Sequence, residues 1–202
     1  MSPLTTHRVL ASTGAFICLL LSACASTTSK QNNIQPQAKT SPPAKNVILF
    51  IGDGMGVSTV TAIRVLDGQQ KGMPGEENVL PFERFQHVAL SKTYEVNQQV
   101  GESGGTATAI MSGQKTNAGF IGMSKGAIRK NCASTKGHHL PTLLEQAELT
   151  GLSTGVVTTT RLTHATPAAT YAHVPERDWE NDRDLTEEAR LNGCTDIATQ
   201  LI

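Results

Sequence analysis

The sequence predicts an α/β fold with a mainly parallel central sheet flanked by helices. Three short apolar runs with the composition of strands, residues 46–51, 88–93 and 154–160, alternate with stretches of helical periodicity. This alternation is typical of parallel sheets, because the crossover between two parallel strands usually contains a helix. The chain has 202 residues, a length that allows one domain or a part of one.

Composition excludes two broad classes of protein. Lys and Arg together number 17, and so do Asp and Glu, which gives a formal net charge of zero at pH 7. A protein whose main partner is nucleic acid needs a basic surface, so we expect no nucleic acid as a specific partner. Hydrophobic residues make up 38% of the chain, which is enough to form a core and excludes disorder throughout.

The first 23 residues are predicted to be a signal peptide of the lipoprotein type. Residues 9–21 are largely apolar and follow His7 and Arg8, but the run is too short to cross a bilayer as a helix. It ends in Leu-Ser-Ala-Cys, which resembles the lipobox of bacterial lipoproteins and assigns Cys24 as the lipidated residue. The alternative is ordinary cleavage next to Ala23, with Cys24 unmodified. We expect secretion across the inner membrane into the periplasm, with a lipid anchor to the cell envelope.

Residues 24–45 are predicted to be a polar, disordered tether. The segment is rich in Ser, Thr and Gln, contains three prolines and has Ile34 as its only large apolar residue. Such a segment cannot bury enough apolar surface to offset the entropy lost on ordering. The globular part is therefore expected to cover residues 46–202.

The first strand and the first helix are predicted on either side of a glycine cluster. Residues 46–51 form a continuous apolar run, which is typical of a strand buried on both faces. From 56 to 67 the apolar residues recur at helical spacing, and Gly68 supplies a stop signal.

The remaining elements continue the alternation. Residues 88–93 are a second candidate strand. Small residues over 103–111 indicate a helix that a glycine closes, and residues 140–150 form an amphipathic helix. Residues 154–160 are a third candidate strand, and the charge-rich stretch 176–190 is interpreted as a solvated loop and helix face.

Asp53 is the first candidate metal ligand, because it closely follows the first predicted strand. In parallel sheets, ligands bind beyond the carboxyl ends of the strands. The run Gly-Asp-Gly-Met-Gly over 52–56 lacks the third glycine of a dinucleotide fingerprint, and an acidic side chain would repel a pyrophosphate. A carboxylate flanked by glycines suits a cation instead. The alternative is a glycine-rich turn in which Asp53 caps the next helix.

Ser103 is the candidate nucleophile. It stands at the start of a helix of small residues, where backbone N–H groups and the helix dipole stabilise an attacking oxygen or a phosphate. A serine hydroxyl is a weak nucleophile without a base or a metal. Because no histidine lies near it in the sequence, a metal is the natural activator. The alternative is that Ser103 is only the N-cap of that helix.

A third cluster follows the last predicted strand. His164 and Thr166 are two residues apart and could face one ion with a nitrogen and a hydroxyl oxygen. Arg177 offers a planar fork suited to two phosphate oxygens. The alternative is a surface turn with a solvated arginine.

Two cysteines remain in the globular part. In an oxidising compartment Cys132 and Cys194 favour a disulfide, and the alternative is two buried free thiols.

Taken together, these motifs closely resemble the alkaline phosphatases, and most closely their animal-type branch. The resemblance runs from Asn46 to the last residue, and three motifs in the right order are far more specific than any one of them. The first motif is Asn46-Val47-Ile48-Leu49-Phe50-Ile51-Gly52-Asp53-Gly54-Met55-Gly56, and the second is Ser103-Gly104-Gly105-Thr106-Ala107-Thr108-Ala109. The third is made up of the segments Val156-Val157-Thr158-Thr159-Thr160-Arg161, Thr163-His164-Ala165-Thr166-Pro167-Ala168 and Tyr171-Ala172-His173.

The resemblance implies a role for each candidate residue. It implies that Ser103 is a zinc ligand and the nucleophile that forms a phosphoserine, and that Asp53 bridges a zinc and a magnesium ion. It implies that Thr166 ligates magnesium with His164 at or directly behind that site, and that Arg177 holds the substrate phosphate. A complete active site would hold two Zn²⁺ and one Mg²⁺.

The resemblance also implies a disulfide between Cys132 and Cys194, and a homodimer for the full-length protein. The implied activity is metal-dependent hydrolysis of small phosphate monoesters. Alkaline phosphatases are considerably longer and carry their remaining zinc ligands in the second half. Residues 46–202 are therefore expected to be the N-terminal part of the catalytic domain, a fragment that is inactive alone.

Two other functions compete with this one. The first is a phosphodiesterase or sulfatase of the same superfamily, although the sequence context that sulfatases need is absent around Ser103. The second is a noncatalytic envelope lipoprotein that keeps the fold and binds phosphate.

The sequence departs from the family pattern at two positions. Glu102 precedes the nucleophile where the family has Asp, and its extra methylene affects the pose of Arg177 more than the identity of Ser103. His164 stands where the better-known bacterial branch has Asp. Losing that carboxylate predicts weaker selectivity for magnesium, with zinc or cobalt substituting.

Overall fold

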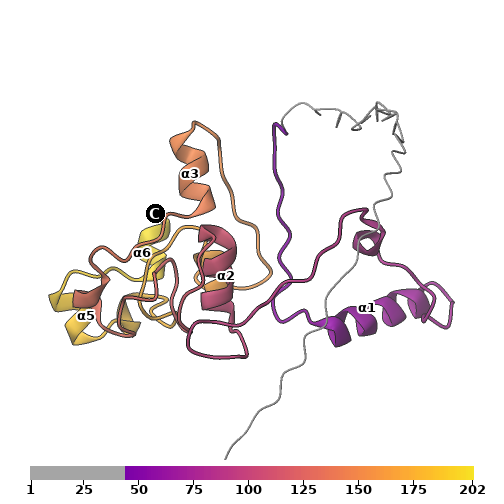
Figure 1. Cartoon of the computed structure of the whole chain (residues 1–202), viewed down its shortest axis with the longest axis horizontal. Helices are drawn as coiled ribbons and strands as arrows, with labels where there is room; N and C mark the ends of the chain where they lie inside the picture. The colour runs from indigo at the N-terminus through magenta and orange to yellow at the C-terminus, as the bar shows by residue number, and fades with distance from the viewer. Residues whose placement is uncertain (1–43) are drawn as a thin grey trace, which may run out of the picture. The chain divides into compact units, whose positions relative to one another are not determined.

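The computed structural model describes residues 44–202 (Figure 1). The predicted signal peptide and Cys24 lie outside the described residues, as does nearly all of the predicted tether. No helix among residues 44–202 is long and apolar enough to cross a membrane. The helical elements are α1 Val57–Gln70, η1 Pro81–Arg84, α2 Ser103–Ser112, η2 Cys132–Thr135, α3 Leu143–Leu149, α4 Ala165–Ala168, η3 Asp182–Asp184, α5 Glu187–Leu191 and α6 Ile197–Leu201.

The three predicted helices form close to their predicted bounds, as α1, α2 and α3. The carboxylate of Glu102 caps the N-terminus of α2, and Gly113 ends it in the left-handed conformation with φ of 73°. A capping box between Thr142 and Glu145 fixes the start of α3. Local signals thus determine where α2 and α3 begin and end. The stop predicted at Gly68 is wrong, because α1 continues to Gln70, and its N-cap Gly56 makes no side-chain cap hydrogen bond.

The parallel sheet is not confirmed, because the three predicted strands have no partners within residues 44–202. Residues 46–51, 88–93 and 154–160 carry no strand assignment. The β-pairing in the described part consists of the isolated bridges Glu95 to Gln98, Ile121 to Val174 and Met123 to His139. An apolar strand is stable only when neighbouring strands take up its backbone hydrogen bonds. Without them the side chains face solvent, and Phe50 is 90% exposed.

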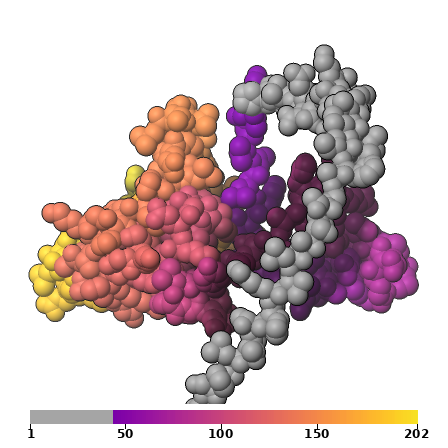
Figure 2. Space-filling model, viewed as in Figure 1, coloured from indigo at the N-terminus to yellow at the C-terminus, as the bar shows by residue number. Residues whose placement is uncertain are grey.

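The core lies between α2 and α4, which pack against each other. Ala107 and Met111 of α2 meet Ala165 and Ala168 of α4 in one buried cluster. Small side chains let the two helices approach closely, which places the residues at their N-terminal ends near one another. Figure 2 shows the magenta to yellow part of the chain, from α2 onward, as a continuous packed body.

The interpretation of residues 176–190 as a solvated stretch is wrong for part of it. Glu176 and Trp179 are 1% and 2% exposed, and Ala189 of α5 is fully buried. The charged composition gave no sign that one carboxylate is buried and paired with an exposed arginine, since Glu176 accepts hydrogen bonds from Nε and Nη2 of Arg129 at 3.0 Å each. Buried carboxylates are tolerated when they are paired in this way.

A disulfide joins Cys132 in η2 to Cys194, directly before α6, with an S–S distance of 2.04 Å. The two cysteines are separated by 62 positions in the sequence, so the bond closes a long loop around the core. Cys132 is a member of the same buried cluster as the residues of α2 and α4.

Candidate active site

Ser103 is the first residue of α2, and its hydroxyl contacts the guanidinium of Arg177. Nη1 of Arg177 donates to Oγ of Ser103 at 2.9 Å. The same nitrogen donates to Oε2 of Glu102, the N-cap residue of α2. One guanidinium nitrogen thus links the candidate nucleophile to the carboxylate that precedes it.

The carboxylate of Glu102 is held by three backbone N–H groups besides Arg177. Oε2 accepts from Gly104 at 2.8 Å, and Oε1 accepts from Gly105 at 2.7 Å and from Gly119 at 2.8 Å. Burial alone would raise the pKa of Glu102, but the N–H groups and the guanidinium lower it below its usual value. Glu102 is therefore a fixed anion that faces Arg177.

Arg177 is fixed along its backbone as well as at its side chain. Its backbone N–H donates to the carbonyl of Gly119 at 2.8 Å. The preceding residue, Glu176, is locked by Arg129, whose guanidinium would contact any side chain placed at Gly119. The planar fork of Arg177 is therefore presented in one orientation, which suits a phosphate with two oxygens to share.

Asp53, Thr166 and His164 form the second part of the site. Oγ1 of Thr166 donates to Oδ2 of Asp53 at 2.8 Å, across 113 positions in the sequence. Nδ1 of His164 lies 3.8 Å from the same carboxylate oxygen. On its other side, Nη2 of Arg177 approaches Nε2 of His164 at 3.4 Å. His164 therefore lies between the carboxylate of Asp53 and the guanidinium of Arg177.

The tautomer of His164 follows from these neighbours. A guanidinium only donates, so Nε2 of His164 accepts and a neutral ring carries its proton on Nδ1. Nδ1 is buried and has no hydrogen-bond partner within residues 44–202. The carboxylate oxygen Oδ2 of Asp53 lies 3.8 Å from this nitrogen, beyond hydrogen-bond distance.

The donor set fits part of a site for a hard cation. Oδ2 of Asp53 and Oγ1 of Thr166 are 2.8 Å apart. Two oxygens that share an edge of a magnesium octahedron are about 2.9 Å apart, because the Mg–O distance is about 2.0–2.1 Å. Within the described part of the chain, no group of three or more His, Cys, Asp and Glu side chains is arranged to hold a metal ion.

The structure thus brings together the five predicted site residues, Ser103, Arg177, Asp53, His164 and Thr166. The alternatives of Asp53 as a cap of the next helix and of a solvated Arg177 do not describe the observed contacts, since α1 has no side-chain cap and Asp53 accepts from Thr166 instead. Ser103 is the first helical residue, and Glu102 is the N-cap in its place.

Sequence reasoning missed three contributors to this neighbourhood. The backbone N–H of Gly119 donates to Glu102, and its carbonyl accepts from the N–H of Arg177. Backbone hydrogen bonds of this kind leave no pattern in a single sequence. Glu176 was grouped with solvated charges. Glu95 is 3% exposed and accepts from the backbone N–H of Glu102 at 3.2 Å, although it lies seven positions earlier in an ordinary polar stretch.

Comparison with known proteins identifies the family. The alkaline phosphatase family matches residues 44–202 of this chain. The tissue-nonspecific isozyme of Homo sapiens is 53% identical over 159 residues, which cover 79% of this chain and 30% of the relative. The alkaline phosphatase of Gadus morhua is 52% identical over 158 residues, which cover 78% of this chain and 33% of the relative. This chain thus spans about a third of the length of these relatives.

One solved structure gives the same result. The cold-active alkaline phosphatase of the psychrophile Shewanella sp. is similar with 30% identity and a TM-score of 0.51, over 64% of this chain and 30% of that one. A variant of the TAB5 alkaline phosphatase with Mg bound in its M3 site is 28% identical over 55% of this chain and 30% of that one, with a TM-score of 0.44. The family match covers the whole described part, including every residue of the candidate site, and the chain belongs to the alkaline phosphatase family.

Proposed function

We propose that this chain carries the nucleophile and the phosphate-binding arginine of an enzyme that hydrolyses phosphate monoesters through a phosphoserine intermediate. The contact of Arg177 Nη1 with both Glu102 and Ser103 carries this proposal. A phosphate held by the guanidinium lies next to the hydroxyl that attacks it. Positioning of this kind and neutralisation of charge are the main contributions of a protein to phosphoryl transfer.

The proposed reaction has three steps: phosphate binding, attack by Ser103 and hydrolysis of the phosphoserine. The guanidinium of Arg177 donates hydrogen bonds to two oxygens of the substrate phosphate. Oγ of Ser103 attacks phosphorus in line, so that the Ser–O–P bond forms as the bond to the leaving alcohol breaks. Water then attacks the phosphoserine, which releases inorganic phosphate and restores the hydroxyl. The N–H groups of Gly104 and Gly105 already donate to the carboxylate of Glu102. The phosphate is therefore held mainly by the guanidinium of Arg177 and not by these two N–H groups.

Zinc and magnesium, when bound, lower the pKa of the attacking hydroxyl and neutralise charge on the phosphate. We propose Asp53 and Ser103 as zinc ligands, and Asp53 and Thr166 as magnesium ligands, with His164 orienting Asp53. A complete site would hold two Zn²⁺ and one Mg²⁺. Because residues 44–202 contain no cluster of three or more His, Cys, Asp and Glu side chains that could hold a metal ion, we propose that the 202-residue chain does not turn over by itself.

The extended apolar segments 46–51, 88–93 and 154–160 are proposed strands of a mainly parallel sheet in the complete enzyme. Their exposure supports this, since Leu90 and Val157 are both fully exposed. Strands buried on both faces of a parallel sheet have this apolar composition.

The decisive experiment uses the full-length, zinc-loaded protein and a chromogenic phosphate monoester. We expect hydrolysis that a chelator abolishes and that the Ser103→Ala variant lacks, together with acid-stable labelling of Ser103 by radioactive substrate. A zinc-loaded protein that binds phosphate without turnover would instead be a noncatalytic phosphate-binding lipoprotein. Preferential cleavage of a phosphate diester would identify a phosphodiesterase of the same superfamily.

We also propose that the protein is exported to the periplasm and anchored by lipid at Cys24, and that the full-length enzyme forms a homodimer. The lipobox-like end of the signal peptide supports the anchor. Labelled palmitate that still incorporates into a Cys24→Ala variant would contradict it, and light scattering of the soluble full-length protein determines the oligomeric state.

A further inference from the structure

Glu95 is a buried carboxyl group next to the candidate site that the proposed mechanism does not use. Its residue is 3% exposed, and Oε1 accepts the backbone N–H of Glu102 at 3.2 Å. Oε2 is buried and has no hydrogen-bond partner within residues 44–202. Burying a half-satisfied carboxyl group costs stability, so such a group beside a functional site requires an explanation.

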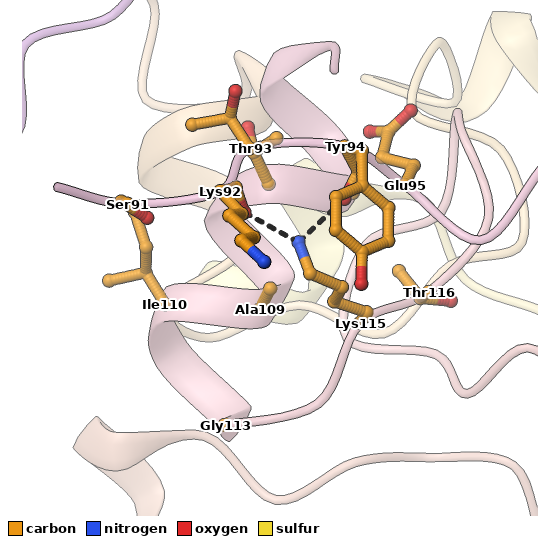
Figure 3. A pocket seen from close by; sticks show the side chains of 12 residues that line it. Ser91, Lys92, Thr93, Tyr94, Glu95, Ala109, Ile110, Gly113, Lys115 and Thr116 are labelled. Atoms are coloured by element: carbon orange, nitrogen blue, oxygen red, sulfur yellow. Dashed lines mark hydrogen bonds between the residues drawn. The ribbon is translucent and has the colours of Figure 1, made fainter. Parts of the chain in front are cut away.

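The backbone around Glu95 is fixed on both sides. The N–H of Glu95 donates to the carbonyl of Gln98 at 3.0 Å, and the next residue, Val96, donates to Thr116 at 3.0 Å. Nζ of Lys115 donates to the carbonyl of Tyr94 at 2.6 Å (Figure 3). Glu95 also lines a cavity of about 380 Å³ between its own segment and α2 (Figure 3).

The sequence of α2 leaves room for both carboxyl groups. A Cβ atom at Gly105 would lie 2.3 Å from Oε1 of Glu95, and one at Gly104 would lie 2.9 Å from Oε1 of Glu102. Two adjacent glycines at the start of a helix are unfavourable for helix propensity. Here they accommodate two glutamates at one helix N-terminus.

We propose that Glu95 is a positioning residue that holds the backbone of Glu102 and, through it, the orientation of Arg177 toward Ser103. The inference rests on the proposed function, because Arg177 is there the phosphate ligand. The contacts form an unbroken series, from Glu95 to the N–H of Glu102, from the Glu102 carboxylate to Arg177, and from Arg177 to Ser103. The glutamate side chain at position 102 has more rotamers than an aspartate would have. Anchoring the backbone of Glu102 reduces the conformational freedom of this side chain.

The protonation of Glu95 is consistent with this role. Burial raises the pKa of Glu95, the N–H of Glu102 lowers it in part, and the negative charge of Glu102 raises it again. Gln98 is the other polar side chain that affects it. Oε1 of Glu95 accepts the N–H of Glu102 at 3.2 Å, and the side-chain carbonyl of glutamine offers an acceptor in the same place.

The test compares three variants of the full-length protein, Glu95→Ala, Glu95→Gln and Glu95→Asp, with Glu77→Ala as the matched control. Glu77 is an exposed glutamate away from the site. Calorimetry gives the dissociation constant of inorganic phosphate, a chromogenic monoester gives kcat and KM, and thermal unfolding reports folding. Losing one hydrogen bond that orients a charged ligand predicts about tenfold weaker phosphate binding and a higher KM for Glu95→Ala.

The conservative variants separate positioning from bulk stability. Glu95→Gln should bind phosphate within about twofold of wild type, because it restores the hydrogen bond. Glu95→Asp keeps the carboxyl group but is one methylene too short to reach the N–H of Glu102, so it should lose affinity as Glu95→Ala does. If Glu95→Ala does not fold, the contrast between these two variants decides the question. Equal phosphate affinity for Glu95→Asp and wild type would overturn the proposal.

A double-mutant cycle tests whether Glu95 acts through Arg177. In an Arg177→Ala background, Glu95→Ala should cause no further loss in kcat/KM. The same loss in both backgrounds would show a purely structural role and refute the inference. A wild-type protein that binds phosphate without hydrolysis refutes the proposed function alone, and phosphate affinity then still tests Glu95. A wild-type protein that binds no phosphate overturns both.

Discussion

Removing the carboxylate of Glu102 should lower both the stability of the protein and its kcat/KM for a phosphate monoester. In Glu102→Ala, the N–H groups of Gly104 and Gly105 lose their cap, which costs about 1 kcal/mol. Arg177 loses its charged partner at a half-buried position, which costs about 2 kcal/mol more. We therefore expect the free energy of unfolding to fall by about 3 kcal/mol.

The catalytic effect of the same change should be similar in size to its effect on folding, because a 10²-fold loss in rate corresponds to about 2.7 kcal/mol. An unpaired Arg177 no longer has a fixed orientation, and misplacement of a positioning group by about 1 Å costs about 10²-fold in rate. The assay is kcat/KM for a chromogenic phosphate monoester, measured with urea unfolding of the same preparation. Wild-type kcat/KM in a folded Glu102→Ala protein, alongside a large loss in Arg177→Ala, would refute the orienting role of Glu102.

The stability effect of Glu102 should also depend on pH in one direction. Its pKa is lower in the folded protein than in the unfolded chain, where it is about 4.3. The stabilisation is therefore complete above the unfolded value and is lost as the pH falls through the folded pKa. The difference in unfolding free energy between wild type and Glu102→Ala should shrink in acid, and a difference that grows there would contradict the assignment.

Three further predictions concern other contacts. Replacing Cys132 and Cys194 by alanine opens a loop of 62 positions and should cost about 4 kcal/mol in urea unfolding, whereas an unchanged midpoint would mean that the bond adds nothing. His164→Asp adds a carboxylate beside Asp53 and should tighten magnesium relative to zinc and cobalt in competition calorimetry, whereas unchanged magnesium affinity would contradict the donor assignment. The hydrogen bond from Arg161 lowers the pKa of Glu180 to about 2, so its stabilisation is complete above the unfolded pKa and is lost as the pH falls toward 2. Glu180→Gln should therefore lose stability at neutral pH and show a flatter acid unfolding profile, and an acid profile identical to wild type would count against this pair.

Local signals explain which parts of the fold were predictable. The helices α1, α2 and α3 are predictable because the signals for a helix are local in the sequence. Apolar spacing lies within each helix, and the caps lie directly next to it. The candidate strands were recognised from composition, but pairing is a property of two segments. Residues 46–51 are as apolar as a buried strand requires, and still Val47 is 81% exposed because no described segment pairs with it.

The site was predictable to the extent that its residues follow predicted elements. Asp53, His164 and Thr166 follow predicted strands, and Ser103 begins a predicted helix. In the predicted parallel sheet, these positions fall at the carboxyl ends of the strands. Glu95 could not be found in this way, because its role depends on two glycines that let a carboxyl group approach the helix. Contacts of this kind depend on interatomic distances that one sequence does not encode as a pattern.

The two halves of the site are held with different strength, and this affects how it assembles. Ser103 begins a helix that packs against α4, so the phosphate-binding half rests on the buried core. Asp53 belongs to a segment whose neighbours Phe50 and Val57 are 90% and 85% exposed, and it meets the core through Thr166 and His164. A single neutral-to-charged hydrogen bond contributes about 1.5–3 kcal/mol, too little to fix a whole segment against its conformational entropy. The half of the site around Ser103 and Arg177 is therefore organised by packing alone, whereas the placement of Asp53 should depend on the proposed pairing of residues 46–51 in the sheet and on the proposed binding of a cation by the carboxylate.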